Sequence, residues 1–206
     1  MANYKELAEK LIPKLEMRKF EVYYCETAKE ASDKVVSLID KNDTVSWGGS
    51  VTLAETGIID RVRKEFSVLD RETAKTPEER GEMMRNSLLC DTFLTSTNAI
   101  SSDGILVNID GIGNRVAAMC FGPKNVIIVA GMNKLCDTVE EAEKRVHDIA
   151  APRNAERLGL TKTGCSAGIC SDCLSEECMC SYVVKTRRSR IPGRIKIILV
   201  GESLGF

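Results

Sequence analysis

The densest concentration of reactive side chains in this 206-residue chain is a run of five cysteines. The run has the spacing C-x4-C-x2-C-x4-C-x-C and comprises Cys165, Cys170, Cys173, Cys178 and Cys180. Glycines and small polar residues surround it, which is typical of a loop rather than of a helix or strand. Thiolates are the preferred ligands of soft metal ions and of iron–sulfur clusters. The spacing therefore predicts a metal or cluster site in this loop.

The spacing leaves the identity of the bound group open. The x4-then-x2 order begins the plant-type iron–sulfur pattern, which takes its fourth cysteine from farther along the chain. A structural zinc usually has two C-x2-C-like pairs, whereas this run has one, Cys170 and Cys173, followed by the close step from Cys178 to Cys180. Disulfides, redox-active thiols and thiols without a function are the alternatives, although clustered intracellular cysteines bind metal more often than they cross-link. An iron–sulfur cluster and zinc are the candidate cofactors.

A second group of polar residues occupies two turn-rich stretches, 95–104 and 108–115. Open α/β sheets bind ligands in the crevice at the C-terminal ends of their strands, and we expect both stretches to converge there. Arg115 could bind an anionic group through paired hydrogen bonds, and Asp103 or Asp110 could transfer a proton or hold a hydroxyl. Alternatively, these are ordinary turns and Arg115 pairs with a surface acid; the number of turn-forming residues around one strand favours a shaped site. The predicted ligand-binding residues here are Asn98, Asp103, Gly104, Asn108, Asp110, Gly113, Asn114 and Arg115.

The sequence Gly48-Gly49-Ser50 follows one predicted strand and opens a predicted helix. Backbone amides at the start of that helix could hold a phosphate or a carboxylate, so these three residues join the predicted ligand-binding set. The alternative is that the glycines serve only the conformation of a tight turn. Glu55 lies about one and a half helical turns beyond Ser50. It is a candidate catalytic carboxylate, together with Asp103 and Asp110.

Predicted strands and helices alternate along the chain and would position these groups. Patterns typical of strands cover residues 20–24, 44–47, 67–69, 92–95, 105–109, 125–130 and 194–200. Helical patterns cover residues 2–19, 28–39, 51–58 and 116–120, a helix that begins at 76–79, and a helix from 138 that ends before Pro152. The alternation predicts a mostly parallel sheet covered by helices. We expect one domain over residues 1–206, with the cysteine-rich stretch as an insertion near residues 162–182.

The composition excludes several classes of protein. The chain has 29 basic and 30 acidic residues, and this balance argues against a general nucleic-acid binder. Its first 20 residues are charged and amphipathic, unlike a signal peptide. The most apolar segment, residues 126–130, is too short to span a bilayer. We therefore expect a cytoplasmic protein that contacts neither nucleic acid nor membrane and whose cysteines are reduced.

Several short segments together carry a resemblance to a known family. These are residues 98–100, 103–104, 106–111, 113–116 and 121–123, and they resemble the LUD-domain family of lactate utilisation proteins. Residues 48–50 and the helix with Glu55 stand where that family has its first glycine-rich loop. The resemblance implies a three-layer α/β sandwich like the group of glucosamine-6-phosphate deaminase, ribose-5-phosphate isomerase and coenzyme-A transferase. It also implies a role accessory to the oxidation of lactate to pyruvate, beside iron–sulfur partner proteins.

The cysteine run is similar to a short, cysteine-rich branch of the family, and lactate itself is therefore only one candidate ligand. We expect a protein that binds a small organic anion and takes part in hydroxy-acid oxidation or related carbon metabolism. It could carry a metal or iron–sulfur site and form a homo-oligomer. The alternatives are a metal or iron–sulfur redox partner with the α/β body as scaffold, and, by fold analogy alone, an isomerase or transferase on a phosphorylated or coenzyme-A-linked substrate. The residues leave open whether the protein is an enzyme.

Overall fold

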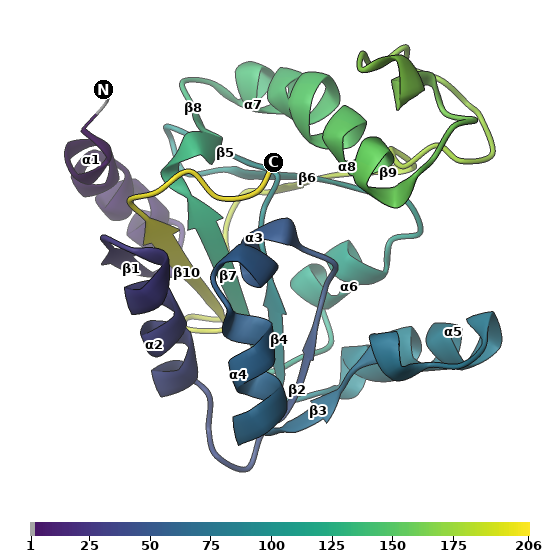
Figure 1. Ribbon diagram of the computed structural model, residues 1–206. Coiled ribbons are helices and arrows are strands. Elements are labelled where there is room, and N and C mark those ends of the chain that lie inside the picture. The colour runs from purple at the N-terminus through teal and green to yellow at the C-terminus, as the bar shows by residue number, and fades with distance from the viewer. Residues whose placement is uncertain (1–2) are drawn as a thin grey trace.

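A central sheet of six parallel strands organises the chain (Figure 1). The computed structural model describes residues 3–206. The strands, in spatial order, are β1 (Glu21–Cys25), β10 (Ile195–Val200), β7 (Asn125–Gly131), β4 (Thr92–Thr95), β2 (Thr44–Trp47) and β3 (Ser67–Leu69). All neighbouring pairs are parallel, as expected when helices connect successive strands. Strands β7 and β10 are almost entirely apolar because helices cover both of their faces.

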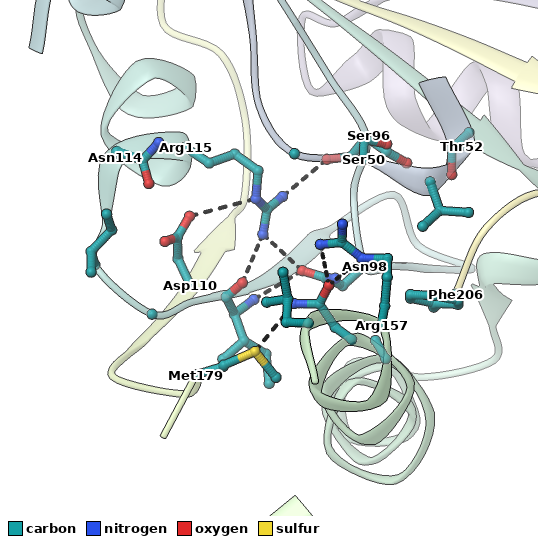
Figure 2. A pocket seen from close by; sticks show the side chains of 18 of the residues that line it. Ser50, Thr52, Ser96, Asn98, Asp110, Asn114, Arg115, Arg157, Met179 and Phe206 are labelled. Atoms are coloured by element: carbon teal, nitrogen blue, oxygen red, sulfur yellow. Dashed lines mark hydrogen bonds and ion pairs between the residues drawn. The ribbon is translucent and has the colours of Figure 1, made fainter. Parts of the chain in front are cut away.

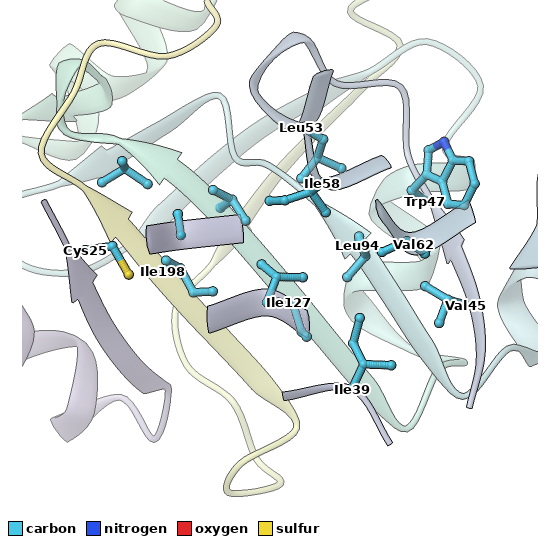
Figure 3. Packing of buried hydrophobic residues seen from close by; sticks show 14 of the residues in the cluster. Cys25, Ile39, Val45, Trp47, Leu53, Ile58, Val62, Leu94, Ile127 and Ile198 are labelled. Carbon is cyan, nitrogen blue, oxygen red and sulfur yellow. The ribbon is translucent and has the colours of Figure 1, made fainter. Parts of the chain in front are cut away.

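One face of this sheet is covered by α2 (Ala28–Leu38), α3 (Val51–Glu55) and α4 (Ile58–Glu65). Figure 3 shows the packing: Ile127 and Ile198 extend from the central strands toward Leu53 and Ile58 of the helices. The opposite face uses the alternate strand residues, such as Ile128 and Ile197, and is covered by α1 (Tyr4–Met17) and α6 (Asn114–Cys120). The period-2 alternation of the strands thus produces two cores. The predicted three-layer α/β sandwich is confirmed.

A second, four-stranded sheet lies beside α6. Its order is β8 (Leu135–Cys136), β5 (Ala99–Ser101), β6 (Leu106–Asp110) and β9 (Tyr182–Thr186). Strand β6 pairs in antiparallel fashion with β5 and β9, and β5 pairs in parallel with β8. The sequence patterns indicate only β6 of these four strands. The other three are short or half exposed, and partners distant in sequence determine their conformation more than local preference does.

The helical segment after β8 extends farther than its sequence predicts. Helix α7 (Val139–Arg145) continues through a single π-helical turn (Val146–Ala150) into α8 (Ala151–Leu158). The predicted end before Pro152 is therefore wrong. Proline is tolerated where a backbone N–H would have no partner, and Pro152 lies in the first turn of α8, directly after the π turn.

The remaining elements are short connections and one helix at the edge of the sheet. These are the 3₁₀ turns η1 (Arg71–Thr73), η2 (Ser87–Leu89), η3 (Met132–Lys134) and η5 (Gly164–Ala167), and helix α5 (Pro77–Asn86). Between η5 and β9 the chain has no regular secondary structure, and this stretch carries four of the five clustered cysteines. None of the helices within residues 3–206 has the length and apolar character that crossing a bilayer requires.

Candidate functional site

A cavity of about 350 Å³ opens at the C-terminal edge of the central sheet. Four neighbouring strands supply part of its wall through the residues that follow them: Ser50 after β2, Asn98 after β4, Lys134 after β7 and Phe206 after β10. Figure 2 shows Ser50, Asn98 and Phe206 around this space. The C-terminal ends of parallel strands are where α/β sheets bind ligands, so the cavity lies at the position that the sequence analysis expects.

The charge of the lining is one-sided. Its acidic member is Asp110, and its basic members are Arg71, Arg80, Arg115, Lys134 and Arg157. These cations come from η1, α5, α6, η3 and α8, which are separate elements of the fold. A partly enclosed space lined by charges of one sign concentrates ions of the opposite sign. The cavity is therefore suited to an anion.

Arg115 lies at the centre of the polar network of the cavity wall (Figure 2). Its Nη1 donates to the carbonyl of Ser96 at 3.0 Å and to Oδ1 of Asn108 at 2.8 Å. Its Nη2 donates to Oδ1 of Asn98 at 2.9 Å and to the carbonyl of Ile109 at 2.7 Å. The side chain is only 12% exposed. Because these donors already serve the protein, Arg115 holds the loop after β4 against β6, and a paired hydrogen bond to a ligand would require breaking that network.

Asp110 is likewise occupied by structural contacts. Its carboxylate accepts hydrogen bonds from the backbone N–H groups of Gly113 at 2.9 Å and Val116 at 3.3 Å, and it lies 3.5 Å from Nε of Arg115. Gly113 has a φ of 85°, a left-handed conformation that favours glycine. The Asp110 carboxylate thus closes the turn into α6 and offsets the charge of Arg115. Nearby Asn114 also lines the cavity.

The predicted site residues Asp103 and Gly104 lie elsewhere. They form the turn between β5 and β6, and antiparallel pairing of these strands places that turn at the opposite end of the hairpin from Asn98 and Asp110. Asp103 is half exposed and pairs with Arg18 at 2.9 Å. The expectation that both Asp-Gly turns lie at one site is therefore wrong for Asp103-Gly104. The sequence pattern predicts a loop at residues 99–101, where the structure has strand β5.

Gly48 and Gly49 permit a close approach of two arginines. A Cβ at Gly49 would lie 2.7 Å from Nη2 of Arg71, and one at Gly48 would lie 3.0 Å from Cγ and Cδ of Arg115. Neither glycine has a positive φ, so space rather than a left-handed turn accounts for them. Ser50 caps α3 by accepting from the N–H of Leu53 at 3.2 Å. Helix α3 has only five residues, which weakens the predicted dipole contribution to anion binding.

Arg71 is a cavity residue that the sequence analysis missed. Burial and the neighbouring charge of Arg80 lower the pKa of its guanidinium. Its Nε is buried and has no hydrogen-bond partner among residues 3–206. A buried donor without a partner is costly, and an anion in the cavity would supply an acceptor. No local motif identifies Arg71, since it lies in an ordinary-looking polar stretch.

Lys134 is the second residue that the sequence analysis missed. It is 3% exposed, and its Nζ lies 2.8 Å from Oγ1 of Thr52 and 2.9 Å from Oγ of Ser96. Burial, assisted by the charges of Arg145 and Arg115, lowers the pKa of its amine to about 7. A lysine with this pKa is partly uncharged at neutral pH, whereas an ordinary lysine is fully charged.

Glu55, the catalytic candidate on α3, is exposed and does not line the cavity. Its Oε2 accepts a hydrogen bond of 2.7 Å from the backbone N–H of Gly205. The carboxylate therefore fastens the segment after β10, of which Phe206 lines the cavity. Its catalytic role stays a prediction that this position does not favour.

Several thiols of the cysteine-rich loop lie close enough to influence one another. Burial and the neighbouring thiol of Cys170 raise the pKa of Cys165. Burial, followed by the thiols of Cys178, Cys165 and Cys170, raises the pKa of Cys180 to about 12. The thiol of Cys173 makes the smallest contribution to the pKa of Cys165.

Cys173 belongs to a different environment within the same loop. Its thiol accepts from the N–H of Gly164 at 3.2 Å and lies 3.3 Å from Oγ of Ser175. Hydrogen bonds from Ser175, Gly164 and Thr163 lower its pKa to about 6. The sequence spacing does not distinguish Cys173 from the other four cysteines; their surroundings do.

His147 is half-buried and places its Nδ1 3.3 Å from Sγ of Cys170. Throughout residues 3–206, no three histidine, cysteine or acidic side chains are grouped closely enough to hold a metal ion. The predicted metal site therefore stays a prediction.

The cysteine-rich loop also contacts the cavity. Met179, between Cys178 and Cys180, lines it, and its Sδ lies 3.3 Å from Nδ2 of Asn154 on α8 (Figure 2). On the other side, the Cα of Met179 would lie 3.6 Å from a Cβ placed on Gly111. The thiols and the cationic cavity are therefore neighbours.

Comparison with known proteins places this chain in a family. The LUD domain pattern matches residues 8–200, nearly the whole chain, and the chain belongs to the LUD domain family. No curated protein matches the sequence. Among solved structures, a DUF162 family protein from Deinococcus radiodurans is similar at a TM-score of 0.56 and 14% identity, over 97% of this chain and 99% of the other. This likeness extends to the fold alone.

A second solved structure, eIF2B delta from Chaetomium thermophilum, is much less similar. It has a TM-score of 0.32 and 18% identity, over 68% of this chain and 54% of the other. A likeness of this size supports no conclusion about the chain.

Proposed function

We propose that the cavity binds a small organic anion and that this cytoplasmic protein is accessory to the oxidation of lactate, or of another hydroxy acid, beside iron–sulfur partner proteins. The observation that carries the proposal is the excess of cations in the lining. Asp110 is already balanced by Arg115, which leaves Arg71, Arg80, Lys134 and Arg157 without an acidic counterpart in the lining. The volume is at the lower end of the range for small-molecule sites, which suits a metabolite.

The arrangement of the cations supports a binding role rather than a purely structural one. Both Nη atoms of Arg115 donate to acceptors in the protein, whereas the buried Nε of Arg71 has no hydrogen-bond partner within residues 3–206. An anion bound between Arg71 and the other unpaired cations of the lining would supply an acceptor to the Nε of Arg71. It would also offset the repulsion between these cations. Family membership supports the metabolic context and does not determine which acid is bound.

The experiment that tests this proposal is calorimetric titration of the protein with lactate, pyruvate, inorganic phosphate and a sugar phosphate. We expect at least one of these anions to bind, and Arg71→Gln to weaken that binding about 10- to 100-fold, the range for a hydrogen bond to a charged group. Arg85→Gln on α5 is the matched control, because Arg85 is 71% exposed, pairs with Glu82 and lies outside the lining. If all four anions fail to bind, or if both variants bind equally well, the cavity does not have this function.

A second function is favoured by the surroundings of the thiols. We propose that Cys165, Cys170, Cys178 and Cys180 bind zinc or an iron–sulfur cluster, with Cys173 outside the ligand set. Two observations support this division: the thiols of Cys178, Cys165 and Cys170 raise the pKa of Cys180, and the thiol of Cys173 is already occupied by hydrogen bonds within the protein. The donor set is suited to a soft metal. Three of its four cysteines, Cys170, Cys178 and Cys180, lie after η5 in a stretch without regular structure that closure around a metal would disrupt.

This metal would supply either a fixed loop conformation, if zinc, or electron transfer, if a cluster. The test is purification without oxygen, followed by elemental analysis and a visible spectrum. We expect Cys170→Ser to lose the metal and Cys173→Ser to retain it, with Cys120→Ser as a control at an exposed cysteine outside the loop. Colourless, metal-free protein with five titratable thiols in the loop contradicts the proposal. Equal metal loss in the Cys170 and Cys173 variants contradicts only the four-thiol assignment.

A further inference from the structure

We infer that the amine of Lys134 forms an imine with carbonyl compounds that enter the cavity, so that the ligands of this site include oxo acids, which are carboxylates with an adjacent ketone or aldehyde. The inference rests on the proposed anion-binding function, because the cationic lining is what would bring the carboxylate group to the amine. It adds a covalent step, imine formation at a named residue, that neither the family nor the fold indicates.

The hydrogen bonds around Lys134 are directional. Thr52 donates its hydroxyl proton to the carbonyl of Leu204 at 3.4 Å, and Ser96 donates its own to the carbonyl of Thr97 at 3.3 Å. With those protons committed, both hydroxyl oxygens can only accept from Nζ of Lys134. Both N–H groups of the uncharged amine are therefore held in place, and the lone pair on its nitrogen is free to react.

Lys134, which carries this lone pair, is one of the residues that line the cavity. Among the hydrogen bonds and ion pairs of residues 3–206, no carboxylate neutralises Lys134. The charged groups that influence it are Arg145 and Arg115, which disfavour the ammonium, and Glu55, which favours it. Burial and the two arginines keep a substantial fraction of the amine uncharged at neutral pH. An uncharged amine is a nucleophile, whereas an ammonium is not.

The reaction balances without any other reagent. The nitrogen lone pair attacks the carbonyl carbon, and the C=O π electrons move to the oxygen, which takes up a proton from the amine to give a carbinolamine. The nitrogen lone pair then expels this hydroxyl, which takes up the second amine proton and leaves as water, so that one C=N bond replaces one C=O bond. The hydroxyls of Thr52 and Ser96 are placed to orient the amine in the first step. The arginines of the lining would hold the carboxylate of the oxo acid.

The simpler interpretation is that Lys134 is a structural residue whose only role is to join α3 to the loop after β4. The two interpretations differ in reactivity. A structural lysine would be inert toward carbonyl compounds and would react no faster than a surface lysine.

The test is reductive trapping. The protein is incubated with pyruvate or glyoxylate and sodium cyanoborohydride at pH 7, digested, and mapped by mass spectrometry. We expect one reduced adduct per chain on the peptide that contains Lys134, formed at least tenfold faster than on any other lysine. The adduct should be absent from Lys134→Met and retained in Lys124→Gln, whose lysine is 81% exposed. The trapping rate should rise between pH 6 and 8, whereas a surface lysine would respond only near pH 10.

The outcomes separate this inference from the function on which it rests. If pyruvate, lactate or phosphate binds in the calorimeter but pyruvate and glyoxylate label surface lysines only, the anion site stands and the imine is refuted. If none of these anions binds and no adduct forms, both are refuted. If Lys134 is labelled and an excess of lactate, which has no carbonyl to trap, slows the labelling at least threefold, both are supported. Circular dichroism of Lys134→Met establishes that the loss of labelling does not come from misfolding.

Discussion

The wall of the cavity and the cysteine-rich loop both carry many polar side chains, but the fold holds those of the wall in place and leaves those of the loop in an irregular segment. In the wall, Arg115 directs its donors to acceptors on two separate segments, the loop after β4 and strand β6, and the network lies between strands and a helix. In the loop, five thiols lie in a stretch with little regular structure. The wall is preorganised, so a ligand meets it without rearrangement; the loop would be organised only by what it binds. The contrast teaches that reactive residue types alone do not define a site, because the elements that carry them decide what they can do.

The largest effect expected from a single substitution is at the wall. Arg115→Ala removes the ion-pair partner of buried Asp110 and one hydrogen-bond partner each of buried Asn108 and half-buried Asn98, and we expect the free energy of unfolding to fall by about 3–5 kcal/mol. Urea denaturation measures this, with Arg85→Ala as an exposed control expected to change it by less than about 0.5 kcal/mol. A loss below about 1 kcal/mol for Arg115→Ala would mean that the wall is not preorganised, and the contrast with the loop would disappear.

The next effect concerns Lys134 and depends on pH. Its pKa is about 7 in the folded protein and near 10.5 when unfolded, so between these values the unfolded chain binds more protons and stability rises with pH. The cost of burying the charge is therefore complete below pH 7 and is lost by pH 10.5. We expect Lys134→Met to be more stable than the wild type by a few kcal/mol at pH 6, and this gain to shrink as the pH rises. Denaturation at pH 6, 8 and 10 checks the trend; a gain that grows with pH would contradict the assigned pKa.

A smaller effect is expected where the glycines approach the arginines. Gly49→Ala would place a methyl group 2.7 Å from the end of the Arg71 side chain, which is able to move. We expect anion binding to weaken about tenfold, equivalent to ~1.4 kcal/mol, while the free energy of unfolding changes by less than about 1 kcal/mol. Calorimetry and denaturation on the same sample separate the two quantities. A large loss of stability with unaltered binding would show that Gly49 serves the turn alone.

The smallest perturbation is a chemical one in the loop. Because hydrogen bonds lower the pKa of Cys173 to about 6, its thiol is mostly a thiolate at pH 7. We expect iodoacetamide to alkylate Cys173 before the other four loop cysteines, with little change in stability, and mass spectrometry of the peptides to resolve the order. Removal of the Ser175 hydroxyl by Ser175→Ala should slow the reaction several-fold. Equal rates at all five thiols would erase the division of the loop into two environments.

Much of the fold and part of the site follow from the sequence. The apolar runs at 125–130 and 194–200 predict buried parallel strands, and β7 and β10 occupy these positions. The turn-forming residues after β4 and β6 predict a polar site, and Asn98, Asp110 and Arg115 do meet in one network. These features are predictable because each depends on local periodicity or on the rule that strand ends carry ligand sites.

The prediction fails where partners distant in sequence decide. Asp103 belongs to a hairpin end that faces away from the cavity, because β5 forms only by pairing with β6 and β8. The sequence pattern predicts that a helix ends before Pro152. In the structure a π turn instead connects α7 to α8, and α8 places Arg157 at the cavity. Neither outcome has a local signal strong enough to be read without the tertiary contacts.

The sequence by itself determined that the chain is an α/β protein of the LUD domain family, that polar turns follow its strands, and that its cysteines are grouped. Only the tertiary structure decided that Arg71, Lys134 and Arg157 line one cavity, and that the donors of Arg115 are used in hydrogen bonds within the protein. The physical reason is range. Secondary structure arises from interactions between near neighbours in the chain, whereas a cavity arises from the packing of segments many tens of residues apart. The same packing determines the burial of the side chains in the cavity and the charges around them, and these set their reactivity.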